Sequence, residues 1–296
     1  CPVIVAPAMD GGMWTHPAVV EHVQALRRRG VTVLDPEEGS LASGRVGQGR
    51  LAEEVRILDA IEAALLPRRD WTGQRVLISA GPTQEPIDPV RYISNRSSGK
   101  MGYALAEAAR ARGAAVILVT GPTALAPPPG VEIVPVETAE EMSKALTVRL
   151  SWSRVVIMSA AVADFRPKHP AVQKWKKHEF KNPVLDLEPT GDILADLSSR
   201  RSGQLLIGFA AETGDLVRHA KQKLRTKAVD LIVANDVTSP GAGFGSDQNA
   251  ATLIDRDGTI SEFTLRSKRR LADDILDAAL QLLRTAARKP AVTAED

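Results

Sequence analysis

The chain has 296 residues, 44% of them hydrophobic, and is therefore long enough to bury one large hydrophobic core or two modest ones. Its 38 basic and 36 acidic residues nearly cancel, and the net charge of +2 excludes a general electrostatic attraction to nucleic acid or to a membrane surface. A single cysteine excludes an internal disulfide, and no apolar run reaches the roughly 18 residues that span a bilayer, so we expect a cytoplasmic protein without nucleic-acid or membrane partners.

Residues 1–70 contain few predicted elements. Short apolar runs predict strands at 3–6 and 31–34, and helical periodicity predicts helices at 17–29 and 51–66. Two strands and two helices cannot close an α/β core by themselves. Because the sequence also begins directly on a strand, without an initiator methionine or a signal peptide, we expect residues 1–70 to be a partial domain at the end of a longer protein.

A charged linker that starts with proline, PRRDWTG at 67–73, marks the domain boundary. Beyond it, predicted strands alternate with predicted helices, which favours a doubly wound, mostly parallel Rossmann-like sheet over residues 71–288. We expect a mobile flap at 165–190 and a disordered tail at 289–296. The predicted strands are 75–80, 115–120, 131–136, 154–159, 205–209 and 229–234, with a hairpin of 251–255 and 260–265, and the predicted helices are 103–112, 139–150, 193–197, 215–227 and 271–283.

Most loops between a strand and a helix need two to six residues, whereas GPTQEPIDPVRYISNRSSGKMG at 81–102 spends about twenty. Prolines keep this segment from becoming helical. Its end, with Ser97, Gly99 and Lys100, opens the next helix with hydroxyl and backbone N–H groups, which hold phosphate at a helix N-terminus. We therefore expect a phosphate site with Arg91 and Asn95 beside it, and the alternative is an ordinary helix capped by serine.

Two nucleotide motifs are excluded, and one enzyme class fits the sequence poorly. A P-loop requires a glycine five residues before Gly99 and a hydroxyl residue after the lysine, but Ser94 and Met101 stand there. The dinucleotide motif GxGxxG is absent as well. A short-chain dehydrogenase needs a Tyr-x-x-x-Lys pair, whereas Tyr92 and Tyr103 are followed four places later by arginine and glutamate.

Segment 81–102 resembles the signature of bacterial phosphopantothenate–cysteine ligases, the second half of a bifunctional coenzyme A biosynthesis protein that also carries phosphopantothenoylcysteine decarboxylase. The resemblance continues through AAVADF at 160–165, KWKK at 174–177, GFAAET at 208–213 and ANDV at 234–237. It implies that CTP, with Mg²⁺, activates 4'-phosphopantothenate to an acyl-cytidylate, which is then joined to cysteine. It also implies a homodimer formed through the ligase domain.

The resemblance assigns roles to individual positions. It implies that Asn95 binds the acyl-cytidylate, that Arg91 acts in the later attack by cysteine, and that Lys174 on the flap closes on the intermediate. Asp164 is suited to the ribose hydroxyl groups, and Phe209 to the cytosine. The other nucleotide-binding positions that it implies are Met158, Ser159, Ala160, Gly191, Asp192, Ile193, Leu194, Lys223 and Lys227, with Gly191 where the family often has proline.

Lysines supply the cations that phosphate chemistry requires. Candidates on the flap are Lys174, Lys176 and Lys177, and Lys223 and Lys227 lie one helical turn apart on one face. The alternative for each lysine is a solvated surface charge, and the alternative for Phe209 is a core aromatic. The alternative for the whole chain is a non-catalytic nucleotide-binding or regulatory module, which the intact Asn95, Arg91 and Lys174 disfavour.

The first domain resembles the end of the flavin-dependent decarboxylase. PAMDGGMW at 7–14 is similar to the family's PxMNxxMW motif, and GSLASGRVGQGR at 39–50 is similar to its substrate-covering flap. Asp10 stands where the family has its substrate-binding asparagine, and Ser43 where it has its catalytic cysteine. Because a hydroxyl is far less acidic than a thiol, we expect no decarboxylase activity, although the resemblance implies FMN. The alternative for this region is a structural remnant.

Overall fold

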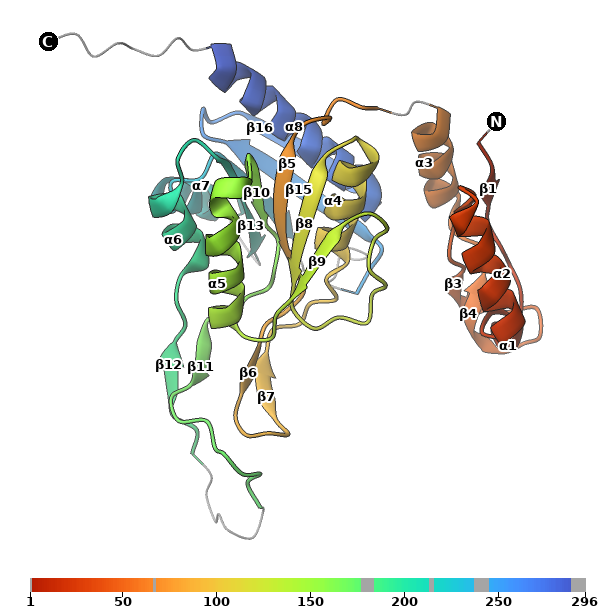
Figure 1. The fold of residues 1–296 in the computed structure, drawn as a ribbon, viewed down its shortest axis with the longest axis horizontal. Coiled ribbons are helices and arrows are strands. Elements are labelled where there is room, and N and C mark those ends of the chain that lie inside the picture. Colours follow the sequence, from red (N-terminus) through yellow and green to blue (C-terminus); the bar gives the residue numbers. More distant parts are fainter. Residues whose placement is uncertain (1, 66–67, 177–183, 213–215, 237–244, 289–296) are drawn as a thin grey trace, which may run out of the picture. The chain divides into compact units, whose positions relative to one another are not determined.

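The computed structural model describes residues 2–65, 68–176, 184–212, 216–236 and 245–288 (Figure 1). The chain divides into two compact units, Cys1–Arg68 and Arg69–Asp296. The predicted tail and part of the predicted flap, with Lys177, lie outside the described residues. Within the described residues, no helix has the length and apolar character that a membrane span requires.

The first unit has a sparse core. Strands β1 and β2 form a parallel pair, and β3 and β4 form an antiparallel hairpin that the sequence pattern did not predict, because its strands are polar and contain glycine. No residue of α1, α2 or α3 is buried, and Leu58, Ile61 and Leu65 of α3 are exposed. The elements are β1 Ile4–Val5, α1 Gly11–Trp14, α2 Pro17–Arg28, β2 Thr32–Val33, β3 Glu37–Ser40, β4 Val46–Arg50 and α3 Glu54–Leu65.

The second unit is built on an eight-stranded sheet with the order β16-β15-β14-β13-β10-β5-β8-β9. From β9 to β14 all neighbouring strands are parallel, and β15 and β16 add an antiparallel hairpin at one edge. The parallel strands therefore follow the Rossmann order, which confirms the predicted fold class. The strands are β5 Arg75–Ala80, β8 Ala115–Thr120, β9 Glu132–Pro135, β10 Val155–Met158, β13 Leu205–Glu212, β14 Leu231–Asp236, β15 Gln248–Asp255 and β16 Ile260–Ser267.

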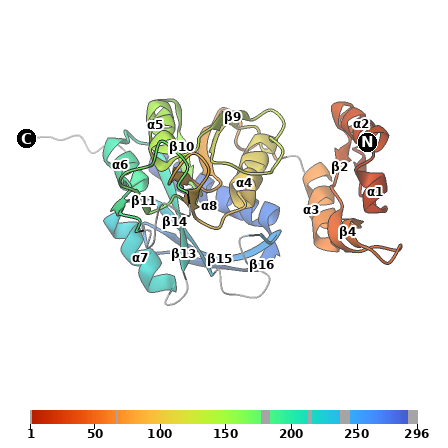
Figure 2. The same ribbon diagram turned by 90° about the horizontal axis from the view of Figure 1, so that it is seen from below.

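Helices cover both faces of this sheet (Figures 1 and 2). On one face, α4 and α8 pack against each other and on a core that includes Leu105, Ile78 and Ile275. On the other face, α5, α6 and α7 bury a second core that includes Leu146 and Leu197. Both sides of the central strands are thus apolar, as their continuous hydrophobic runs predicted. The helices are α4 Lys100–Ala111, α5 Ala139–Arg149, a 3₁₀ turn η1 Leu150–Trp152, α6 Ile193–Arg200, α7 Leu216–Thr226 and α8 Lys268–Arg288.

Two segments that the sequence predicted to be irregular contain strands. The long loop after β5 folds into an antiparallel hairpin of β6 Gln84–Pro86 and β7 Tyr92–Ser94. The predicted flap begins and ends as an antiparallel ribbon of β11 Phe165–Pro167 and β12 Leu187–Pro189. Strands this short, several of them containing proline, leave no period that a sequence pattern can reveal. Both hairpins project from the same end of the sheet (Figure 1).

Candidate functional site

The strand order changes direction between β5 and β10, the first and fourth parallel strands of the chain. Open α/β sheets bind ligands in the crevice beyond the carboxyl ends of such neighbouring strands, where the connections leave toward opposite faces. The segments that leave here are 81–99 after β5 and 159–164 after β10. They carry six of the predicted site residues, so the topology and the motif indicate the same region. These residues are Arg91, Asn95, Ser97, Ser159, Ala160 and Asp164.

Backbone and hydroxyl contacts join these two segments. Pro82 forms a parallel bridge with Ala161, and the Ala161 N–H donates to the Gly81 carbonyl oxygen over 2.9 Å. The Ala163 N–H donates to the Oγ1 of Thr83 over 3.0 Å, and Thr83 is completely buried. The turn after β10 is therefore held in place by the first residues of the long loop.

Ser79 anchors the other end of the same turn. Its carbonyl oxygen accepts a hydrogen bond of 2.7 Å from the Ser159 hydroxyl, and its Oγ accepts one of 3.2 Å from the Ala160 N–H. Sequence reasoning missed Ser79 and Thr83 as parts of the site. The available signal was a hydroxyl residue in, or just after, an otherwise apolar buried strand.

Asn95 reaches the turn from the end of β7. Its side-chain nitrogen Nδ2 donates to the Val162 carbonyl oxygen over 2.8 Å. Ser94, its neighbour, donates from Oγ to the Thr83 carbonyl oxygen over 2.7 Å. The structure thus brings Asn95 together with Met158, Ser159, Ala160 and Asp164 at the end of β10.

Helix α4 starts without a serine cap. Its N-cap is Gly99, whose φ of 76° lies in the left-handed region that favours glycine, and no side chain caps the helix there. Ser97 instead accepts the Gly99 N–H over 3.3 Å, so the alternative of an ordinary Ser-capped helix is wrong. A Cβ at Gly102 would lie 2.5 Å from the Cβ of Ala80, which shows how closely this first turn approaches β5.

Arg91 and Asn95, both of which the sequence analysis expected beside one phosphate site, lie apart from each other. The two residues flank β7, and at about 3.3 Å per residue they are roughly 13 Å apart. Arg91 lies at the tip of the β6–β7 hairpin, where its Nε donates to Oδ2 of Asp88 over 2.9 Å and its Nη2 donates to the Trp175 carbonyl oxygen over 2.7 Å. Lys174, exposed, precedes Trp175. Arg91 and the Lys174 segment therefore meet at this tip.

Asp88 is the carboxylate at the centre of that tip, and its side chain is fully buried. Its Oδ1 accepts the backbone N–H groups of Val90 and Arg91 over 2.8 and 2.9 Å, and its Oδ2 accepts the Trp175 N–H over 3.2 Å. Burial raises the pKa of Asp88, but the hydrogen bonds that it accepts outweigh burial and lower the pKa to about 2. Asp88 is therefore ionised at neutral pH.

A third group of predicted site residues lies around β13 and α7. Asp192 begins α6 by accepting the Ala195 N–H over 3.0 Å, and its other carboxylate oxygen accepts a hydrogen bond from Lys227. Burial raises the pKa of Asp192, but the bond from Lys227 and the helix cap lower it below its usual value. Lys223 donates to the Phe209 carbonyl oxygen over 2.8 Å. Lys223, Lys227, Asp192 and Phe209 are thus neighbours.

The turn 190–194 connects this group to the end of β10. Thr190 donates from Oγ1 to the Ala163 carbonyl oxygen over 2.6 Å and from its N–H to the Asp164 carbonyl oxygen over 3.0 Å. Phe209 is partly buried and packs against the core. A Cβ at Gly191 would meet no atom within 4 Å. The turn that carries the predicted positions Gly191, Asp192, Ile193 and Leu194 therefore adjoins the segment 159–164, and Lys227 is joined to this turn through Asp192.

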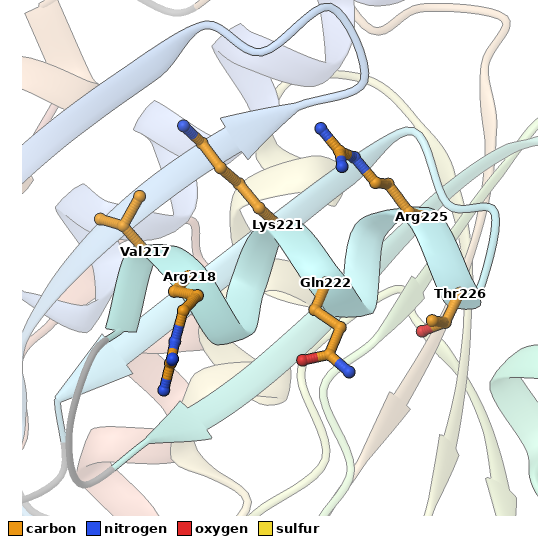
Figure 3. A pocket seen from close by; sticks show the side chains of 6 residues that line it. All are labelled: Val217, Arg218, Lys221, Gln222, Arg225 and Thr226. Atoms are coloured by element: carbon orange, nitrogen blue, oxygen red, sulfur yellow. The ribbon is translucent and has the colours of Figure 1, made fainter.

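The outer surface of α7 carries a separate pocket, lined by six residues of that helix (Figure 3). Lys221 and Arg225 extend from the same side of the helix there. At 100° per residue, Lys221 and Lys223 point in roughly opposite directions, about 200° apart. This pocket is therefore not the predicted nucleotide site. Its lining consists of Val217, Arg218, Lys221, Gln222, Arg225 and Thr226.

In the first unit, the two predicted positions are in contact. The Ser43 hydroxyl donates to Oδ2 of Asp10 over 2.6 Å, while Oδ1 of Asp10 accepts the Gly12 N–H over 3.1 Å and caps α1. The hydrogen bond from Ser43 is the largest influence on the pKa of Asp10, which lies below its usual value. Asp10 is an acceptor in both contacts.

No cluster of three or more His, Cys, Asp or Glu side chains that could hold a metal ion occurs among the described residues. A magnesium ion bound to nucleotide phosphates needs only one or two protein carboxylates, because phosphate oxygens and water complete its coordination. Asp164 is an exposed carboxylate at the end of β10. The described side chains therefore fit a magnesium ion that arrives with a nucleotide better than a metal held by protein alone.

Comparison with known families assigns both units. Residues 71–283 match the family described as "DNA/pantothenate metabolism flavoprotein C-terminal domain", and residues 1–66 match the family described as "Flavoprotein". The two matches meet within the linker that the sequence predicted, between the two compact units of the structure.

Known proteins match over nearly the whole chain. The chain is 45% identical over 278 residues to the Coenzyme A biosynthesis bifunctional protein CoaBC of Bacillus subtilis, covering 93% of this chain and 68% of that protein. It is 43% identical over 289 residues to a cysteine/cysteine sulfinic acid decarboxylase of an unidentified prokaryote, covering 96% of this chain and 80% of that protein.

A solved structure matches the larger unit. The crystal structure of the C-terminal domain of a CoaBC protein has a TM-score of 0.64 and 45% sequence identity to this chain. The match covers 73% of this chain and 99% of the solved one. At this level of identity, the likeness extends beyond the fold to the sequence of the domain.

Proposed function

Because the chain belongs to the family of bifunctional coenzyme A biosynthesis proteins, we propose that its residues 71–288 form a phosphopantothenate–cysteine ligase that uses CTP. Residues 1–70 belong to a flavoprotein-like domain in this proposal. The observation that carries the proposal is that the signature loop 81–99 and the turn 159–164 meet at the switch point of the sheet, and that the turn 190–194 joins them to the Lys223–Lys227 group.

The first step activates a carboxylate. A carboxylate oxygen of 4'-phosphopantothenate attacks the α-phosphorus of CTP, the bond from that phosphorus to the bridging oxygen breaks, and pyrophosphate leaves. Lys223 and Lys227 are placed to attract the phosphates, and magnesium, when bound with CTP, neutralises phosphate charge. Asp164 faces the ribose in this proposal, and Phe209 lies beside the base.

Asn95 holds the acyl group of the resulting intermediate. Its amide nitrogen carries two hydrogens, and the bond to Val162 uses one of them. The other is available to a carbonyl oxygen on which negative charge develops when the acyl carbon is attacked. The 2.8 Å hydrogen bond to the Val162 carbonyl oxygen holds the amide beside the turn that carries the proposed nucleotide contacts. Binding therefore requires little reorganisation of the Asn95 side chain.

The second step forms the amide. The cysteine nitrogen attacks the acyl carbon, and the bond between that carbon and the cytidylate oxygen breaks. CMP leaves, and the attacking nitrogen loses one proton. Arg91 and Lys174 act in this step. Their place at the hairpin tip, about 13 Å along β7 from Asn95, supports a division of labour between activation and transfer.

The first unit departs from the expected decarboxylase pattern at two positions. The pair of Asp10 and Ser43 offers no thiol and holds a carboxylate that stays ionised at neutral pH. We therefore derive no decarboxylation step for this chain.

The proposal is tested by the release of pyrophosphate from the purified protein. Release is expected only when CTP, Mg²⁺ and 4'-phosphopantothenate are all present, and CMP together with the cysteine amide is expected after cysteine is added. Omission of the acid substrate is the control for simple hydrolysis of CTP. If no nucleotide supports release, or if release does not depend on the acid, the assignment is wrong.

A further inference from the structure

Asp88 links two elements that carry proposed transfer residues. It lies at the tip of the β6–β7 hairpin, whereas Trp175 belongs to the segment that follows β11, 87 residues later in the chain. The Trp175 N–H donates to Asp88, and the Trp175 carbonyl oxygen accepts a hydrogen bond from Arg91. Both backbone polar groups of Trp175 are therefore held by one carboxylate–guanidinium pair.

The ion pair between Asp88 and Arg91 fixes the orientation of the guanidinium group. Oδ2 of Asp88 lies 2.9 Å from Nε and 2.6 Å from Nη2 of Arg91, so one edge of the guanidinium is committed to the carboxylate. Removing these donors would leave a buried carboxylate unpaired, which costs free energy. We therefore expect the hydrogen bonds around Asp88 to form together and to be lost together. A second contact, from the Ala171 N–H to the Ile87 carbonyl oxygen over 2.8 Å, extends the docking toward β11.

We propose that Asp88 is the positioning residue that docks segment 171–176 on the hairpin tip and thereby sets Lys174 and Arg91 as one unit for amide formation. Asp88 touches no substrate in this arrangement, since its side chain is fully buried. It acts through the orientation of the Arg91 guanidinium and through the backbone next to Lys174. The activity part of this inference rests on the proposed ligase function, and the docking part does not.

The variant Asp88→Asn tests the inference. It keeps the shape but replaces one acceptor oxygen by an N–H₂ group, which then faces the Trp175 N–H or the guanidinium as donor against donor. The matched control is Asp186→Asn, the same chemical change on an exposed residue that precedes β12. Folding of both variants is checked by thermal unfolding before activity is measured.

Limited trypsin digestion measures docking without any activity. Cleavage after Lys174 and Lys176, followed by mass spectrometry, is expected to be at least about tenfold faster in Asp88→Asn than in the wild type and in Asp186→Asn. A second pair of variants covers the case in which Asp88→Asn does not fold. Trp175→Pro removes the N–H that Asp88 accepts and is expected to be cleaved after Lys176 faster than Trp175→Ala, which keeps it. Only cleavage after Lys176 is compared in this pair, because trypsin does not cleave the bond before a proline. Equal cleavage within each pair overturns the docking.

Kinetics separate positioning from general damage. Asp88→Asn is expected to lower kcat for amide formation about a hundredfold while the KM for CTP changes less than about twofold, because Asp88 contacts none of the proposed nucleotide-binding residues at the end of β10, in the turn 190–194 and on α7. In the background Arg91→Gln/Lys174→Ala, the same change is expected to cost less than about threefold. A full hundredfold loss in that background overturns the inference. Wild-type protein without ligase activity refutes the proposed function alone, and digestion still decides the docking.

Discussion

Ser43 donates a 2.6 Å hydrogen bond to the carboxylate of Asp10, although the two residues lie 33 positions apart. The contact ties the turn between β3 and β4 to the start of α1, because the same carboxylate caps that helix. The two positions at which this chain departs from the decarboxylase pattern are therefore a single hydrogen-bonded unit. A change at one of them alters the other.

This pairing predicts that Ser43→Cys alone does not restore decarboxylation. A thiol is a weaker hydrogen-bond donor than a hydroxyl, and here it would face an ionised carboxylate that raises its pKa and opposes formation of the thiolate. Release of carbon dioxide from 4'-phosphopantothenoylcysteine is measured with added FMN for the wild type, for Ser43→Cys, and for Ser43→Cys combined with Asp10→Asn. Activity in the wild type, or in Ser43→Cys alone, contradicts the prediction.

Asn95→Asp and Arg91→Gln are expected to separate the two steps. Asn95→Asp exchanges an amide donor for a negative charge next to phosphates, so formation or retention of the acyl-cytidylate is expected to fall roughly a hundredfold, or by on the order of 3 kcal/mol. Arg91→Gln is expected to release pyrophosphate in the absence of cysteine but to transfer the acyl group slowly. Single-turnover assays with labelled CTP follow the acyl-cytidylate and the release of CMP. If pyrophosphate release is blocked as completely in Arg91→Gln as in Asn95→Asp, the proposed division of roles between the two residues is wrong.

Lys227→Met is expected to raise the KM for CTP roughly tenfold or more, because it removes an ammonium group from the proposed phosphate contacts. Lys221→Met is the matched control on the same helix, since its side chain extends into the pocket on the outer surface of α7 (Figure 3). Initial rates are measured over a range of CTP concentrations at fixed Mg²⁺. Equal KM values for the two variants would remove Lys227 from the nucleotide site.

Because Lys268 is buried, we expect the free energy of unfolding to depend on pH. Its ammonium group is largely buried at the start of α8 and donates to the Ser246 carbonyl oxygen, near Lys100 and Asp247. Burial, and then the charge of Lys100, lower its pKa from 10.5 to about 8, while Asp247 opposes this shift. Between these two pH values the unfolded chain binds more protons at this site than the folded chain, so this lysine contributes stability that increases with pH.

The measurement is urea unfolding of the wild type and Lys268→Met from pH 7 to pH 10.5. The free energy of unfolding of the wild type, relative to that of the variant, is expected to rise above pH 8 and to level off near the pKa of an exposed lysine. Lys144→Met, at an exposed position on α5, is the control and is expected to show no such trend. A constant difference between wild type and Lys268→Met refutes the shifted pKa.

The amino-acid sequence alone determined the fold class and the order of the main elements. Continuous apolar runs marked the strands β5, β8 and β10, and glycine with helix-forming residues bounded α4, because these preferences act between near neighbours in the chain. The irregular composition of segment 81–102 carried the family resemblance. The boundary near residue 70 also followed from local composition.

Only the tertiary structure decided which of the marked residues meet. It placed Asn95 on the Val162 carbonyl and separated it from Arg91, because the three residues between them form the extended strand β7, which is too short for its period to be recognised in the sequence. It joined Asp88 to Trp175 and Asp10 to Ser43 across long stretches of sequence. Such contacts depend on where the packing of the sheet and the hairpins brings distant segments, and a residue's own neighbours in sequence do not encode that position.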